Sequence, residues 1–313
     1  MHILYYHQHF STRAGISGTR SYELSRRLVG QGHRVTLVCG SYAQGNTGLN
    51  GSFRNGQRRG FVDGIRVIEL ELPYSNKHGF LRRSMAFLRF ALRSARIALV
   101  SQYDIVFATT TPLTAGIPGI VARWLRRKPF VFEVRDLWPE LPRAMGVLTN
   151  PIILGALSIL EVVSYRSAHR CIGLSPGIVD GIHRRGVSRR RIALVPNGCD
   201  LDLFGDLNIE PASPAGIDEG DLVAIFTGTH GLANGLDKVL DAACELRRRG
   251  RTDIKFLFVG DGKCKDDLVR RARDDNLVNC IFLAPVPKAQ LAKLMCRANV
   301  GLMVLANIPA FYY

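Results

Sequence analysis

Short apolar segments alternate with helical segments along almost the whole chain, and this alternation constrains the fold more than any other feature. The apolar segments in the first two thirds cover residues 3–6, 34–39, 65–70, 104–108, 130–134, 170–174 and 192–195. The helices predicted between them cover residues 18–30, 81–100, 113–126, 151–168 and 177–184. Short, mostly apolar strands are typical of a parallel sheet with helices on both faces. The pattern therefore predicts a doubly wound α/β domain.

Two polar stretches interrupt the alternation. Residues 43–59 are rich in Gly, Asn and Arg, and we expect a mobile loop there. Residues 206–220 contain Pro211, Pro214 and Gly216 and predict a linker. After the linker the alternation restarts, with strands predicted at 222–226, 254–259, 280–283 and 300–305 and helices at 234–249, 263–275 and 288–297. We therefore predict a first domain at residues 1–205 and a second, incomplete one at residues 221–313.

The second domain is about half as long as the first and ends on the apolar, aromatic tail NIPAFYY. Leaving such a tail in water is costly, because burying each large apolar side chain is worth about 1.5–3 kcal/mol. We expect a truncated second domain.

Composition narrows the cellular setting. The formal net charge of +16 suits nucleic acid, anionic lipid or phosphorylated substrates, although the arginine bias of a GC-rich genome would also produce it. The chain shows no aromatic-rich nucleic-acid motif, no membrane-spanning window and no signal-peptide pattern. Its seven cysteines are scattered without a CxxC pair. We expect a cytoplasmic protein with reduced thiols, no metal site and no nucleic-acid partner.

Five segments place a turn between a strand and the residues that follow it. They are GISGTRSYELSRRL (15–28), LVPNGCD (194–200), FTGTHGLANGLD (226–237), FLFVGDGKCKDDL (256–268) and CIFLAPVPKAQL (280–291). A glycine turn that leads into a helix lets the N–H groups at the helix N-terminus approach a phosphate.

In this order the five segments resemble the family 4 glycosyltransferases of the GT-B fold, with Ala284 where the family has glycine. Residues 5–28 and 133–148 are most similar to the bacterial branch that assembles O-antigen and capsule repeats. That branch includes transferases assigned to N-acetyl-L-fucosamine. The resemblance implies two Rossmann-like domains facing each other across a cleft, with the acceptor on the first and a nucleotide-sugar on the second. It also implies retention of the anomeric configuration, with no metal ion and no cofactor.

The resemblance also assigns site residues. Those implied to bind the donor are Gly15, Gly18, Arg20, Asn197, Gly228, Thr229, His230, Gly231, Asn234, Gly260, Asp261, Gly262, Val286 and Pro287. Arg135 and Asp136 stand where many relatives carry His-Asp beside the donor sugar. Glu140 is either an acceptor-side base or a carboxylate favoured by the dipole at a helix start. Glu133 either points along its strand toward the ligand or pairs with an arginine.

The chain departs from the family in the charges around the diphosphate. Thr229 and Asn234 replace the usual Arg and Lys, and an uncompensated diphosphate would be expensive to bury. Arg20 and Arg135 are candidate replacements. His230 is a third if protonated, or else a histidine in a surface turn. The family's paired acidic motif lies beyond residue 313, so we expect this chain to have little or no transferase activity.

Residues 77–96 contain six Lys or Arg and no Asp or Glu. The spacing of Arg82, Arg89, Arg93 and Arg96 puts them on one helical face, and Phe87, Leu88, Phe90, Leu92 and Ile97 supply an apolar side. Such a helix either lies on an anionic membrane at the inner face of the plasma membrane, which suits a lipid-linked acceptor, or is a domain helix with one solvated face.

The sequence thus predicts a retaining glycosyltransferase that moves a hexosyl or N-acetylhexosaminyl group from a UDP-sugar to a lipid-linked or glycan acceptor in surface-polysaccharide synthesis. Two alternatives stay open. One is a UDP-sugar 2-epimerase with the same two-domain architecture, and the other is a basic lipid- or RNA-binding module.

Overall fold

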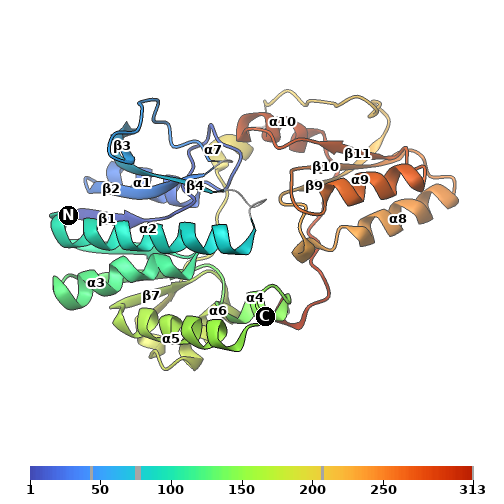
Figure 1. The fold of residues 1–313 in the computed structure, drawn as a ribbon. Helices are drawn as coiled ribbons and strands as arrows, with labels where there is room; N and C mark the ends of the chain where they lie inside the picture. Colours follow the sequence, from blue (N-terminus) through green and yellow to red (C-terminus); the bar gives the residue numbers. More distant parts are fainter. Residues whose placement is uncertain (43–44, 75–78, 206–207, 312–313) are drawn as a thin grey trace. The chain divides into compact units, whose positions relative to one another are not determined.

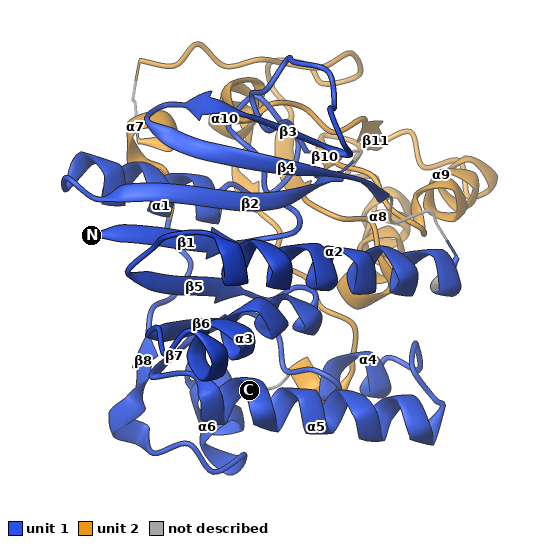
Figure 2. Cartoon of the chain, turned by 60° about the vertical axis from the view of Figure 1, so that its left-hand side comes forward, with its two compact units in different colours: residues 1–198, 313 blue, residues 199–312 orange. Residues whose placement is uncertain are grey.

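The structure is a computed structural model that describes residues 1–42, 45–74, 79–205 and 208–311. The chain forms two compact units, the first covering Met1–Gly198 and the second starting at Cys199 (Figure 2). Each unit has its own sheet and its own hydrophobic cores.

Unit 1 contains an eight-stranded sheet with the order β3-β4-β2-β1-β5-β6-β7-β8 (Figure 2). The strands are β1 (His2–Tyr6), β2 (Arg34–Tyr42), β3 (Gln57–Val62), β4 (Ile65–Tyr74), β5 (Ile105–Thr109), β6 (Phe130–Val134), β7 (Arg170–Gly173) and β8 (Ile192–Leu194). Neighbouring strands pair in parallel, except that β3 is antiparallel to β4. The strand order reverses direction between β1 and β5.

The helices of unit 1 are α1 (Arg20–Gly30), α2 (Phe80–Val100), α3 (Ile117–Leu125), α4 (Glu140–Ala144), α5 (Pro151–Ser167) and α6 (Pro176–Arg184). Alternate residues of β1 enter different cores. Leu4 and Tyr6 lie in the core that includes Phe90 of α2, whereas Tyr5 lies in the core that includes Tyr22 of α1. Both faces of the sheet are therefore covered, which explains why the strands are almost continuously apolar.

The expectation of a mobile loop at residues 43–59 is wrong at its C-terminal end, while residues 43 and 44 lie outside the described part. β3 begins at Gln57 and forms a hairpin with β4 through Asp63 and Gly64, which both have positive φ. A two-residue Asp-Gly loop is a strong hairpin signal. The sequence did not predict this strand, because Arg58 and Arg59 fit a β-strand only where it is half exposed at the edge of a sheet.

Unit 2 contains a four-stranded parallel sheet with the order β11-β10-β9-β12. Its strands are β9 (Leu222–Thr227), β10 (Ile254–Val259), β11 (Cys280–Leu283) and β12 (Val300–Gly301), and its helices are α7 (Leu201–Phe204), α8 (Asp237–Arg248), α9 (Lys265–Asp274) and α10 (Lys288–Arg297). β12 is shorter than the expected 300–305, because it lies at the sheet edge and pairs only with β9. The order reverses between β9 and β12.

The described part of the predicted linker packs within unit 2. The backbone N–H of Ala212 donates to the carbonyl of Lys293 at 3.1 Å, and the Arg297 side chain donates to the carbonyl of Asp218 at 2.6 Å. Ile217 is buried in one of the cores of unit 2.

Candidate functional site

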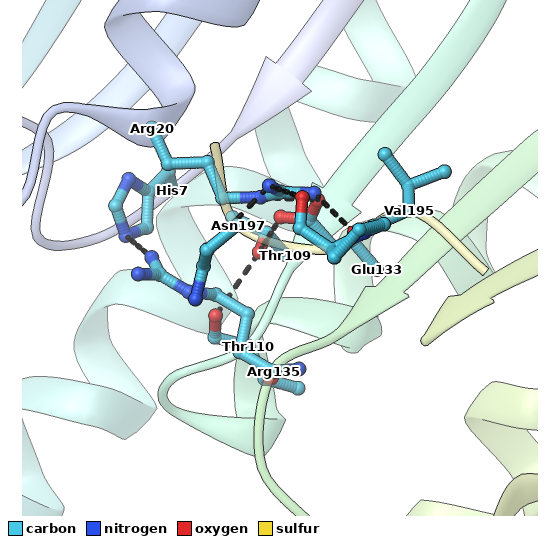
Figure 3. A network of polar contacts seen from close by, with 9 residues as sticks. His7, Arg20, Thr109, Thr110, Glu133, Arg135, Val195 and Asn197 are labelled. Atoms are coloured by element: carbon cyan, nitrogen blue, oxygen red, sulfur yellow. Dashed lines mark hydrogen bonds and ion pairs between the residues drawn. The ribbon is translucent and has the colours of Figure 1, made fainter. Parts of the chain in front are cut away.

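In open parallel sheets, ligands bind outside the carboxyl ends of the strands, at the point where the strand order reverses. In unit 1 this point lies between β1 and β5. The residues that follow the strands there include His7 after β1, Thr110 after β5 and Arg135 after β6. Figure 3 shows these side chains converging from the three strands.

An ion pair between Arg20 and Glu133 organises this edge of unit 1. Arg20 Nε and Nη2 donate to Glu133 Oε1 at 3.0 and 2.9 Å, and Glu133 is only 1% exposed. Arg20 also donates to the carbonyls of Val195 and Pro196 at 3.0 and 2.8 Å and approaches Asn197 Oδ1 at 3.5 Å. Of the two alternatives for Glu133, the structure has the arginine pair. Arg20 therefore holds together α1, β6 and the segment after β8, and its charge is already matched by a carboxylate.

Arg135 is held differently. Its backbone N–H donates to Thr110 Oγ1 at 2.8 Å, and its Nη1 donates to His7 Nε2 at 3.4 Å. His7 Nδ1 shares a hydrogen bond of 2.6 Å with Ser21 Oγ of α1. Burial lowers the pKa of His7 well below its usual value, and the Arg135 guanidinium lowers this pKa further. Arg135 thus rests on a neutral imidazole, and no carboxylate in the described residues forms an ion pair with it.

Asp136 and Glu140 follow Arg135 along the chain. Thr111 Oγ1 donates to Asp136 Oδ2 at 3.1 Å, which holds this carboxylate beside the end of β5. Glu140 is exposed and is the first residue of the short helix α4. This position is the helix start that the sequence offered as one alternative, and the role of an acceptor-side base stays a prediction.

The two glycines before α1 differ in their surroundings. A Cβ on Gly15 would lie 2.0 Å from Ser11 Oγ and 2.9 Å from the backbone nitrogen of Asn46, so close packing requires glycine there. A Cβ on Gly18 would meet nothing within 4 Å. No side chain caps the N-terminus of α1 with a hydrogen bond. Gly18 therefore lies in open space beside a helix N-terminus, where an anion is favoured.

In unit 2 the loops after β9 and β10 pack backbone against backbone. A Cβ on Gly260 would lie 1.8 Å from the carbonyl oxygen of Gly228, and one on Gly262 would lie 2.4 Å from that of His230. The His230 N–H donates to the Asp261 carbonyl at 3.0 Å, which links the two loops. The Asp261 side chain accepts from the N–H of Gly262 at 2.8 Å. Residues with a side chain at 260 or 262 would force these loops apart.

His230 fits neither alternative that the sequence offered. The residue is fully buried among Phe226, Phe258 and Phe282 rather than in a surface turn. Burial, together with the nearby Lys265 ammonium, lowers the pKa of His230 to about 4. The ring is therefore neutral at pH 7 and cannot balance a diphosphate. Within the described residues, neither ring nitrogen has a hydrogen-bond partner.

The remaining predicted residues of unit 2 lie after the same strands. Thr229, Gly231 and Asn234 belong to the segment between β9 and α8, in which residues 232–234 form a short 3₁₀ turn. Val286 and Pro287 lie between β11 and α10, where Pro287 immediately precedes the helix. α8 and α9 both start without a side-chain cap.

Sequence reasoning missed Lys265, the first residue of α9. Its Nζ donates to the carbonyls of Gly260 and Leu283, both at 2.7 Å, and so ties the ends of β10 and β11 together. This lysine supplies a cation at the carboxyl end of the sheet in a unit that lacks the usual pair at Thr229 and Asn234. A lysine so close to a Gly-Asp-Gly turn is the signal that could have identified it.

The described residues contain no group of three or more His, Cys, Asp or Glu side chains that could hold a metal ion. Nor does any described helix combine the length and apolarity needed to cross a membrane. The expectations of metal independence and of membrane association both stay predictions.

Structural comparison defines the fold class as GT-B, with two Rossmann-like units. The Anabaena protein Alr3699/HepE, solved in complex with UDP and glucose, matches 96% of this chain and 73% of its own with a TM-score of 0.59 and 16% identity. A structure from E. coli described as trehalose-6-phosphate, bound with UDP-2-fluoro glucose, matches 97% of this chain and 78% of its own with a TM-score of 0.69 and 11% identity.

The family follows from the sequence model that matches residues 17–198, which is more than half of the chain. This chain belongs to the family described as glycosyl transferase 4-like domain. A curated relative, the probable glycosyltransferase WbjE of Pseudomonas aeruginosa, is 24% identical over 241 residues. The aligned region covers 75% of this chain but only 59% of that relative.

Proposed function

We propose that this chain binds a nucleotide-diphosphate sugar, UDP-linked, and transfers the sugar to an acceptor hydroxyl. The observation that carries the proposal is the carboxyl edge of the sheet in unit 2. There the two glycine loops pack against each other and leave Gly228 exposed and Gly262 partly exposed, and no side chain caps the N-termini of α8 and α9 that follow the loops. Such an edge is suited to a diphosphate. Family membership and neighbours solved with UDP or a UDP-sugar support the same ligand.

The proposed chemistry retains the configuration at the anomeric carbon. The acceptor oxygen forms its bond on the face from which the diphosphate departs, the bond between that carbon and the phosphate oxygen breaks, and the proton of the acceptor hydroxyl passes to the departing phosphate oxygen. Charge then grows on the departing diphosphate, where N–H dipoles and cations stabilise it. In unit 2 we assign this stabilisation to Lys265, whose Nζ lies at the ends of β10 and β11. The roles of Arg135 and Asp136 beside the donor sugar stay predictions from the family resemblance.

Calorimetric titration of the chain with UDP, GDP and UDP-sugars tests donor binding. Gly231→Ala is the informative variant, because its Cβ would make only ordinary contacts within the chain. Gly220→Ala is the control in the same unit, since a Cβ there would meet no atom within 4 Å. We expect Gly231→Ala to weaken UDP binding at least tenfold and the control to leave it unchanged. Equal affinity in the two variants, or no UDP binding by the parent chain, contradicts the proposal.

We further propose that the acceptor is lipid-linked or a glycan, that the transferred group is a hexose or an N-acetylhexosamine, and that the product enters a surface polysaccharide. Such an acceptor places the protein at the inner face of the plasma membrane. Incubation with UDP-sugars and lipid-linked acceptors, followed by NMR of the products, tests this assignment. An anomeric linkage opposite to that of the donor refutes retention. Conversion of the donor sugar without any acceptor indicates the epimerase instead.

A further inference from the structure

The outward face of α2 exposes apolar side chains in a single stripe. Phe90 and Ile97 are buried in a core that includes residues of the sheet. On the opposite side, five large apolar side chains are between 39% and 77% exposed, namely Leu81, Met85, Leu88, Leu92 and Leu99. Their spacing of four, three, four and seven residues keeps them on one face. Of the predicted apolar side, Phe90 and Ile97 are therefore buried, whereas Leu88 and Leu92 are exposed.

A row of arginines runs beside this stripe. Arg82, Arg89 and Arg96 are exposed and recur every seven residues, which places the row roughly 70° around the helix from the leucines. Arg93 differs, since it is partly buried and donates to the carbonyl of Asn55 at 3.2 Å. α2 contains no acidic residue.

Exposed apolar residues also lie at the end of α3, which packs beside α2 (Figures 1 and 2). Trp124 and Leu125, at the end of α3, are 64% and 67% exposed. The Arg123 guanidinium lies 5.7 Å from the centre of the Trp124 ring, and Trp124 Nε1 donates to Ser167 Oγ of α5 at 2.9 Å. Residues 117–128 also contain no acidic side chain. We call these exposed apolar residues and the three arginines of α2 the α2–α3 face.

We propose that the α2–α3 face docks on an anionic lipid bilayer, with the leucines and Trp124 inserted at the boundary of headgroups and acyl chains and the arginines at lipid phosphates. An amphipathic surface with basic residues beside large apolar ones has the chemistry for this position, and Trp is enriched at the same depth. The inference deepens the proposed membrane location, on which it rests, by naming the surface that contacts the lipid; vesicle binding itself requires no nucleotide-sugar.

The charge of the α2–α3 face favours an anionic bilayer over a second copy of the chain or an RNA. A second copy of the same face would set rows of arginine against each other with no carboxylate in α2 or α3 to balance them. RNA would pair with the arginines but would leave the leucine stripe in water. An anionic membrane satisfies both parts of the face.

The test measures flotation of the full chain with vesicles of phosphatidylglycerol and phosphatidylcholine, and with phosphatidylcholine alone. Replacing Arg82, Arg89 and Arg96 by Gln is expected to weaken binding to the anionic vesicles about a hundredfold, since each basic residue near the surface contributes about a factor of five. Leu88→Ser/Leu92→Ser is expected to abolish the binding that persists at high salt, because insertion of apolar groups is not screened.

Two matched controls separate the face from bulk properties. Arg248, Arg249 and Arg270, changed together to Gln, remove the same charge from exposed positions in unit 2. Leu201→Ser/Val278→Ser removes two apolar side chains that are also well exposed. Both controls are expected to bind vesicles like the parent chain.

Trp124 reports insertion directly. The chain has two tryptophans, so the variant Trp138→Phe leaves Trp124 as the single reporter. We expect lipids brominated on the acyl chain to quench its fluorescence.

Three results overturn the proposal: no binding to anionic vesicles, equal loss in the variants and their controls, or binding without quenching. A dimer dispersed by Leu88→Ser/Leu92→Ser, without vesicle binding, assigns the face to a second copy. UDP titration of the same variants keeps the two proposals apart. A variant that no longer floats with vesicles but still binds UDP bears only on the α2–α3 face. A chain that floats with vesicles but does not bind UDP bears only on the proposed transferase function.

Discussion

Replacement of Arg20 by Met is expected to destabilise unit 1 by about 3–5 kcal/mol, the usual effect of leaving a buried charge without its partner. Glu133 is 1% exposed and accepts two hydrogen bonds from Arg20 and one from Thr109 Oγ1 at 2.6 Å. In the variant only the threonine contact remains. The carbonyls of Val195 and Pro196 also lose their donor, although they can turn to water at this partly exposed position.

The double variant Arg20→Met/Glu133→Gln is expected to be more stable than Arg20→Met alone. Glutamine carries no charge, so the cost of burying an unpaired carboxylate disappears, and its carbonyl can still accept from Thr109. We expect a coupling energy of about 1–3 kcal/mol from the complete cycle of single and double variants. Arg26→Met is the control, because Arg26 forms a more exposed pair with Glu23 at 3.5 Å and should cost less than about 1 kcal/mol.

Urea unfolding followed by tryptophan fluorescence measures the free energy of unfolding of unit 1 in each variant. Both tryptophans of the chain, Trp124 and Trp138, lie in unit 1, so the signal reports its unfolding without that of unit 2. The reasoning is refuted if Arg20→Met costs no more than Arg26→Met, or if Glu133→Gln gives no rescue.

Three further predictions concern unit 2. Gly260→Ala should loosen the loops after β9 and β10 and destabilise the unit by about 1–3 kcal/mol, seen as faster hydrogen exchange in β9 and β10, whereas Gly220→Ala should change nothing; unchanged exchange in both contradicts the tight packing. Lys265→Met should weaken UDP binding about tenfold or more in calorimetry, because it removes a cation and two charge-assisted hydrogen bonds, and an unchanged affinity removes Lys265 from the site. The pKa of His230 is about 4 in the folded chain and about 6.5 when unfolded, so the unfolded state binds the extra proton between these values. The contribution of neutral His230 to the free energy of unfolding is therefore fully present above about pH 6.5 and falls by about 3 kcal/mol toward pH 4. In urea unfolding followed by circular dichroism, His230→Phe should make the free energy of unfolding less dependent on pH. The same pH profile in the parent chain and in the variant refutes this prediction.

The sequence predicts helices and strands correctly where the local pattern of apolar residues agrees with what the fold buries. The sequence predicts β6, β10, β11 and α10 with the bounds that the structure has. Each is bounded by turn residues and has the apolar content of a buried strand or the periodicity of a packed helix. β3 was missed because an edge strand takes much of its stability from pairing with its neighbour rather than from its own composition.

The candidate site was predictable to a smaller extent. The glycine turns and Arg135 could be recognised as candidates, because turns after strands occur at the ligand-binding edge in this class of sheet. The environment of each side chain could not be recognised. His230 lies in a turn by sequence, yet three phenylalanines from β9, β10 and β11 bury it, and that burial sets its protonation state.

The amino-acid sequence by itself determined two α/β units and the strand ends that carry glycines, since strand and helix periods and turn chemistry are local properties. Only the tertiary structure decided which of these residues meet. Arg20 and Glu133 are 113 positions apart and pair because α1 begins and β6 ends at the same edge of one sheet. The outward position of Leu88 and Leu92 depended likewise on which side of α2 the sheet and neighbouring helices cover. Contacts between distant segments depend on packing, which no local window of sequence contains.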